Sequence, residues 1–98
     1  MPTFSNCRVV VTCDDGRPVH EDASAQLRID DEFLIVHYWD EEGPVVFVAE
    51  RPSGKVFELK CRSRPRHARL ELSEAGDRLS GSWREDDREG TLVVEIPI

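Results

Sequence analysis

The feature that most constrains the fold of this chain is the regular recurrence of turn-forming residues. Clusters of such residues divide the sequence at short intervals: Asp14-Asp15-Gly16, Asp30-Asp31, Glu42-Gly43-Pro44, Pro52-Ser53-Gly54, Ser63-Arg64-Pro65, Ala75-Gly76-Asp77 and Glu89-Gly90. Each interval holds one run of β-branched, aromatic or alternating residues of strand length, which is the pattern of antiparallel hairpins in series. No segment carries a convincing helical period. The sequence therefore predicts an all-β protein.

Eight strands are expected, near residues 6–13, 25–30, 32–39, 45–51, 55–62, 66–73, 78–85 and 90–96. Residues 17–24 are expected to form a long loop or a single helical turn. Short strands joined in sequence can close into a barrel, and closure removes both exposed sheet edges. We therefore expect an antiparallel up-and-down meander that closes into a small barrel. A β-sandwich is the alternative, in which residues 14–24 supply the long crossover.

The 98 residues are expected to form a single domain, residues 1–98, with a net charge of -7. The first residues lack the basic region and long apolar run of an export signal. The apolar stretches near Phe33 and Val45 are shorter than the roughly 20 residues that span a bilayer. These features predict a cytoplasmic protein that does not enter the membrane.

Three cysteines are present, and an odd number cannot all pair within one chain. Cys7 and Cys13 fall on one expected strand, where a separation of about 20 Å keeps them from bonding to each other. A bridge from Cys61 to either of them remains geometrically open. We expect reduced thiols, with Cys7 and Cys13 on the same buried face as Val9 and Val11, and no catalytic role.

Alternation along the expected strands predicts which side chains face inward. Strands 66–73, 78–85 and 90–96 place apolar and small residues on one face, namely Ala68, Leu70, Leu72, Leu79, Gly81, Trp83, Leu92, Val94 and Ile96. Strands 32–39 and 45–51 are apolar on both faces, so something is expected to cover their outer face. The N-terminal residues, the loop at 17–24 or a second copy would serve. We predict a homodimer whose interface comprises Leu34, Val36, Tyr38, Val46 and Val48.

The C-terminal quarter of the chain also carries a resemblance. Leu79-Ser80-Gly81-Ser82-Trp83, an acidic turn and Glu89-Gly90-Thr91-Leu92 follow one another. This order resembles the closing hairpin of small bacterial lipocalin-like and avidin-like barrels, although the chain has no N-terminal Gly-x-Trp strand. The resemblance implies a barrel whose open end accepts a small apolar ligand.

The candidate ligand-binding residues are His37, Trp39, Phe47 and Trp83. An eight-stranded barrel is just wide enough to be filled by its side chains or to hold one small ligand. Large inward residues beside small ones such as Ala49 and Gly81 fit either a cavity or a tightly packed core. His37, Tyr38 and Trp39 end a strand beside an acidic turn, so they are expected either at the mouth of a pocket or at a solvated rim.

No catalytic, metal-binding or cofactor motif is recognised. His20, His37 and His67 lack metal-ligand spacing, and no phosphate-binding loop is present. Residues 51–70 carry a net charge of +6, and the remaining residues sum to -13. The acidic remainder would repel a polyanion, so nucleic-acid binding is not expected. The basic hairpin is expected instead to contact the acidic turn at residues 85–89, within the chain or between subunits.

These observations favour a small non-enzymatic β-barrel that associates with itself and offers a site for a small apolar ligand. One alternative is an interaction module whose doubly apolar strands bind a different protein. Another is an enzyme that uses barrel-mouth residues such as His37 and Tyr38 as acid or base.

Overall fold

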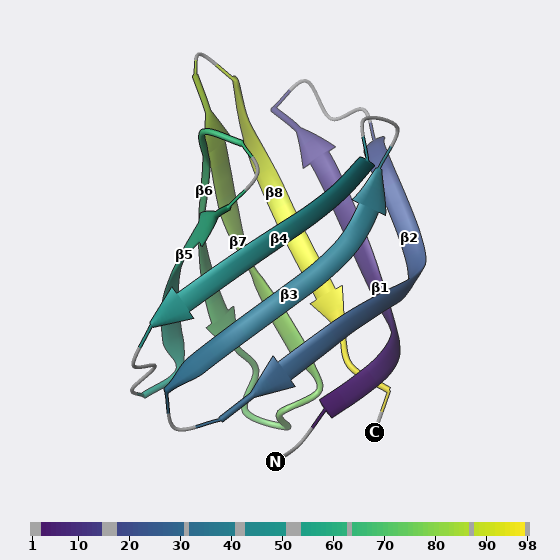
Figure 1. Cartoon of the computed structure of the whole chain (residues 1–98), viewed down its shortest axis with the longest axis vertical. Coiled ribbons are helices and arrows are strands. Elements are labelled where there is room, and N and C mark those ends of the chain that lie inside the picture. Colours follow the sequence, from purple (N-terminus) through teal and green to yellow (C-terminus); the bar gives the residue numbers. More distant parts are fainter. Residues whose placement is uncertain are drawn as a thin grey trace.

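The computed structural model describes residues 3–14, 18–30, 32–40, 43–50, 54–62, 64–86 and 88–97. It confirms an all-β fold in which eight antiparallel strands form a closed barrel (Figure 1). Each strand pairs with the next one along the chain, and β1 also pairs with β8. The strands are β1 (Thr3–Cys13), β2 (Pro18–Ile29), β3 (Phe33–Asp40), β4 (Gly43–Glu50), β5 (Val56–Cys61), β6 (Arg66–Leu72), β7 (Arg78–Glu85) and β8 (Arg88–Glu95).

The meander gives the barrel two distinct ends. In the view of Figure 1, β3 and β4 cross the front of the molecule, and β5 to β8 run behind them. Odd-numbered strands end at the upper end, together with the starts of the even-numbered strands. Both chain termini lie at the lower end. The last residues of β3 and β7 and the first residue of β6 therefore meet at the upper end.

The interior of the barrel is filled by apolar side chains, as the alternation along β6, β7 and β8 predicts. Trp83 is 2% exposed, and the inward residues of every strand join one continuous cluster. Its buried members are Cys7, Val9, Val11, Ala25, Leu27, Leu34, Val36, Tyr38, Val45, Phe47, Ala49, Phe57, Leu59, Ala68, Leu70, Leu79, Trp83, Leu92, Val94 and Ile96. Burial of apolar surface on this scale is the main favourable contribution to folding.

The first two strands are longer than the sequence predicts. β1 begins at Thr3 rather than near residue 6, and β2 begins at Pro18, so the prediction of a loop or helical turn over 17–24 is wrong for residues 18–24. The register between β1 and β2 shifts between Phe4 and Cys7, between Cys7 and Val9, and between Val11 and Thr12. Such irregularities interrupt the strict alternation of apolar and polar residues, so the sequence pattern of β2 did not predict a strand there.

Two inward-facing glycines allow the strands to approach closely. A Cβ atom built on Gly81 would stand 1.8 Å from the carbonyl oxygen of Arg69 on β6. A Cβ atom on Gly90 would stand 1.8 Å from the carbonyl oxygen of Thr12 on β1. Neither contact is possible, so glycine is required at both places for β7 and β8 to bend into a closed wall.

Candidate functional site

The four candidate ligand residues do not form one site. Phe47 and Trp83 are buried inside the barrel, whereas His37 and Trp39 face outward on β3. The wall of the barrel separates the two pairs. A ligand inside the barrel would have to displace packed side chains, because Phe47 and its neighbours already fill the interior. Ligand binding therefore remains a prediction.

The predicted interface also mixes two faces of the sheet. Leu34, Val36 and Tyr38 are at most 1% exposed and lie in the core, so their assignment to an outer interface is wrong. The register explains the error: these three residues pair with Ala49, Phe47 and Val45 of β4, all of which are buried. Val46 and Val48 lie on the opposite face, across from His37 and Ile35. Alternation could not distinguish the two faces of β3, because both are apolar.

The outer face of β3 and β4 carries its own band of apolar and aromatic residues. We call this band the outer strip; its members are Phe33, Ile35, His37, Trp39, Pro44, Val46 and Val48. Trp39 is 47% exposed, and its ring lies 4.2 Å from the His37 ring, centroid to centroid. The Nε2 atom of His37 is buried without a hydrogen-bond partner. The strip thus combines an exposed aromatic ring with an unsatisfied polar atom.

Charged residues of both signs border the outer strip. Arg28 on β2 lies across from Ile35, and Lys60 on β5 lies across from Val48. Glu50 lies at the end of the strip, paired in register with Phe33. One basic residue therefore borders the strip on each of its two long sides, and an acidic residue lies at its end.

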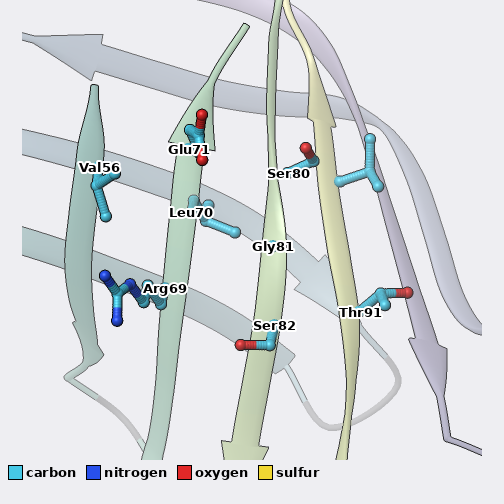
Figure 2. A pocket seen from close by; sticks show the side chains of 9 residues that line it. Val56, Arg69, Leu70, Glu71, Ser80, Gly81, Ser82 and Thr91 are labelled. Atoms are coloured by element: carbon cyan, nitrogen blue, oxygen red, sulfur yellow. The ribbon is translucent and has the colours of Figure 1, made fainter.

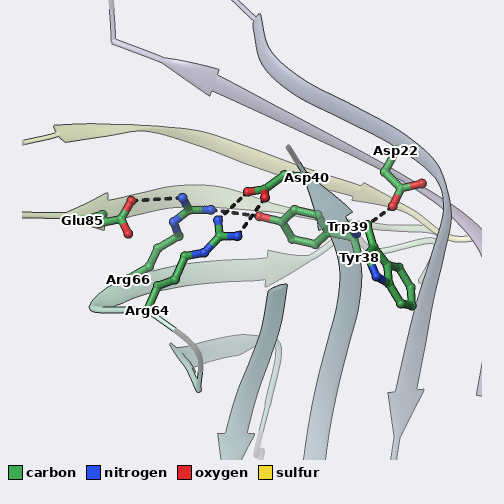
Figure 3. A network of polar contacts seen from close by, with 7 residues as sticks. All are labelled: Asp22, Tyr38, Trp39, Asp40, Arg64, Arg66 and Glu85. Carbon is green, nitrogen blue, oxygen red and sulfur yellow. Dashed lines mark hydrogen bonds and ion pairs between the residues drawn. The ribbon is translucent and has the colours of Figure 1, made fainter. Parts of the chain in front are cut away.

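A network of polar side chains occupies the upper end of the barrel (Figure 3). Arg66 is 7% exposed; one of its guanidinium nitrogens donates to the Tyr38 hydroxyl at 3.2 Å, and the other donates to Glu85 at 3.0 Å. Its guanidinium also lies 5.2 Å from the centre of the Trp83 ring. The pair with Glu85 confirms the predicted contact between the basic hairpin and the acidic turn. A buried arginine needs such partners because desolvation of an unpaired charge is costly.

Arg64 makes a second pair at this end. Its two terminal nitrogens donate to the two carboxylate oxygens of Asp40, at 2.5 and 2.8 Å. The sequence places Arg64 and Arg66 in a basic hairpin, but nothing in the sequence identifies Asp40 or Tyr38 as their partners. Burial raises the pKa of Tyr38 to about 12, although Arg66 opposes the shift.

His37 and Tyr38, the two residues that would act in the enzyme alternative, lie on opposite faces of β3. Tyr38 points into the barrel and contacts Arg66, whereas His37 faces outward beside Trp39. Successive residues of a strand face opposite sides of the sheet, so the two side chains cannot act on one substrate. In the part of the chain that the structure describes, no group of three His, Cys, Asp or Glu side chains is placed to hold a metal ion.

A surface hollow lies on the outer face of β5 to β8 (Figure 2). It measures about 660 Å³ and includes Ser80, Ser82 and Thr91 beside the longer side chains of Arg69 and Glu71. Arg69 is 3.5 Å from Glu58, and both side chains are largely exposed. The hollow is an open trough whose charged side chains are solvated, and its lining does not point to one class of ligand.

None of the three cysteines, all of which lie in the described ranges, takes part in a disulfide. Cys7 is buried on the inward face with Val9 and Val11, as alternation predicts, and burial raises the pKa of its thiol. A raised pKa lowers the fraction of reactive thiolate. Cys13 and Cys61 are partly buried and pack against the core.

Comparison with models of known protein families found no match. No curated protein matches the chain at a significant level. Among the described residues, the structure contains no helix of the length and apolarity needed to cross a membrane.

Proposed function

We propose that this protein is a small interaction module that associates with a second copy of itself through the outer strip. The observation that carries the proposal is the exposed Trp39 ring beside partly exposed Ile35, His37 and Val46 on two adjacent strands. Contiguous apolar patches of several hundred Å² are uncommon on monomeric soluble proteins and mark interaction sites. Tryptophan is also among the residues that contribute most to binding at interfaces.

Charge supports a second copy as the occupant. The front face in Figure 1 spans the two longer dimensions of the molecule, 34 and 25 Å, and the outer strip crosses part of it. A stable dimer typically buries roughly 800 Å² per partner, so residues around the strip would join the interface. A two-fold interface uses the same patch on both copies, and the border of this patch carries both signs of charge in Arg28, Lys60 and Glu50. The basic residues beside the strip also reduce repulsion between two chains that each carry -7.

Native mass spectrometry of the protein over a range of concentrations tests this proposal. We expect a dimer for the wild-type chain and a monomer for Trp39→Ser and Val46→Glu. Loss of an exposed tryptophan contact should weaken association by about 30-fold or more. Val56→Lys is the matched control, because Val56 is 41% exposed but lies on β5, outside the strip.

A wild-type chain that stays monomeric at every concentration would contradict self-association and favour the alternative of a different protein partner. A dimer that persists in both strip variants would place the interface elsewhere. The same spectra report the mass of any ligand that co-purifies, which bears on the predicted apolar ligand. The cytoplasmic location remains a prediction.

A further inference from the structure

Among the described residues, the shortest pairing in the barrel wall is that of β4 with β5. β3 and β4 are in register along their whole length, from Phe33↔Glu50 to Asp40↔Gly43. Among the described residues, β4 and β5 share only the register pairs Phe47↔Cys61 and Val48↔Lys60, with one further hydrogen bond from the Arg62 amide to the Val46 carbonyl. We call this short junction the seam. Residues 56–59 of β5 have no described register partner on β4, so fewer hydrogen bonds resist separation here.

The surface is hollowed beside the seam. The hollow measures about 520 Å³ and is lined from both strands, by Val48 and Glu50 on β4 and by Glu58, Lys60, Cys61 and Arg62 on and after β5. Behind it, Phe47 and Leu59 belong to the buried core. Separation of the two strands would therefore connect this hollow directly to the apolar interior.

Two arginines tie the barrel together across the seam. Arg64 and Arg66 lie after β5, and their partners Asp40 and Tyr38 lie on β3, before β4. Each side-chain contact therefore links the segment before β4 to the segment after β5, in addition to the short backbone pairing of β4 with β5 (Figure 3). Charge-assisted bidentate pairs such as Arg64–Asp40 are among the stronger and more directional polar contacts.

We propose that the barrel opens locally at the seam, and that the contacts of Arg64 and Arg66 with β3 hold it closed. Among the described residues this junction has the fewest register pairs, and the longer ladders, such as those of β3 with β4 and of β7 with β8, keep their strands together. The opened seam exposes Phe47 and Leu59 of the packed core to the surrounding solution. Arg64 and Arg66 thus control access to the core.

The rate at which Cys61 reacts with N-ethylmaleimide tests the proposal, because this thiol lines the hollow at the seam. Each cysteine is followed separately by mass spectrometry of its peptide in the full-length protein. We expect Arg64→Met to accelerate the reaction of Cys61 about tenfold, the effect of losing one charged hydrogen-bonded contact from the closed state. A faster reaction reports more frequent opening of the seam.

Two controls separate local opening from general destabilisation. Arg8→Met removes an ion pair of 2.7 Å with Glu21 at the junction of β1 and β2, and should leave the rate of Cys61 unchanged. Cys13 lies in register with Gly90 at the junction of β1 and β8, and should keep its rate in Arg64→Met. If Cys61 does not accelerate, or if Cys13 accelerates equally, the proposal is wrong.

Hydrogen exchange of the unmodified protein tests the same idea without any variant. Peptides that cover β4 and β5 should exchange about tenfold faster than peptides that cover β7 and β8, because local openings need less free energy than global unfolding. Equal protection of all four strands would show that the seam does not open on its own.

Discussion

Arg66 illustrates how single residues acquire their roles only in the folded barrel. As a residue of a basic hairpin it should be solvated, yet it is buried between Glu85, Tyr38 and the face of Trp83. Its long aliphatic stem can extend through apolar surroundings while its guanidinium keeps polar partners. The indole nitrogen of Trp83 in turn donates to the carbonyl oxygen of Thr12 at 3.1 Å. Charge and aromatic surface therefore stabilise the upper end together.

Tyr38 should make stability depend on alkaline pH. Burial raises its pKa from 10.0 to about 12, so below pH 10 the folded and unfolded chains both hold the proton. Between about pH 10 and 12 the unfolded chain releases it and the folded chain does not, so the free energy of unfolding falls as pH rises, by on the order of 2 kcal/mol. Urea unfolding at several pH values should show this loss in the wild type.

Tyr38→Phe supplies the control for that experiment, because it removes the titrating group and keeps the ring. Its stability should decline less over the same pH range. Tyr38 is the only tyrosine in the chain, so an absorbance titration follows it without overlap. A titration midpoint near 10 in the folded protein would contradict a buried, hydrogen-bonded hydroxyl.

At the scale of the element, closure depends on where strands bend. β1 pairs with both β2 and β8, and it changes register three times along its pairing with β2. Asn6, which lies within one of these irregular stretches, has a φ of 58°, a backbone conformation that asparagine adopts more readily than most residues. These local irregularities let one long strand join the front and back of the barrel.

Gly90→Ala should destabilise the protein because the added methyl group would collide with the Thr12 carbonyl, a backbone atom that cannot move without shifting β1. We expect a loss of about 1 to 3 kcal/mol in the free energy of unfolding, the usual cost of overpacking. Thr91→Ala is the matched control, since Thr91 is the next residue and is exposed. Denaturant unfolding measures the free energy of unfolding of both variants. A Gly90→Ala protein as stable as wild type would show that β1 and β8 do not approach each other so closely.

At the scale of the whole molecule, the first and last strands close the barrel. Arg8 of β1 lies across from Glu95 of β8, and both termini emerge at the lower end in Figure 1. Within the described residues every strand pairs with two neighbours, so no strand is an edge along its whole length. Association is therefore expected through side chains on the outer face, as the outer strip provides.

A circularly permuted chain should fold to the same barrel. Joining residues 1 and 98 with a short Gly/Ser linker and starting the chain at Ala75 places the new ends in an exposed turn between β6 and β7. Exposed turns tolerate such cuts because few core contacts cross them. We expect cooperative unfolding and an all-β circular dichroism spectrum, with modest loss of stability from the hydrogen bonds of Ser73 in that turn. Failure of this chain to fold would argue against the pairing of β1 with β8.

The local sequence pattern alone determined the fold class, the number of strands and which side chains of β6 to β8 point into the barrel. In those strands one face is apolar and the other polar, so a period of two residues identifies the inward side, as for Leu79 and Trp83. The turn residues likewise marked most strand boundaries to within a few residues. These features depend on neighbours in the chain and need no knowledge of the distant strands.

Only the tertiary structure decided which face of β3 is buried and which partners Arg64 and Arg66 find. Leu34 and Ile35 are equally apolar, so their burial depends on how the wall curves when β1 meets β8. The pairs of Arg64 with Asp40 and of Arg66 with Tyr38 join residues 24 and 28 positions apart, across two intervening strands. Such contacts follow from the closure of the barrel, because closure alone brings non-adjacent strands together at one end.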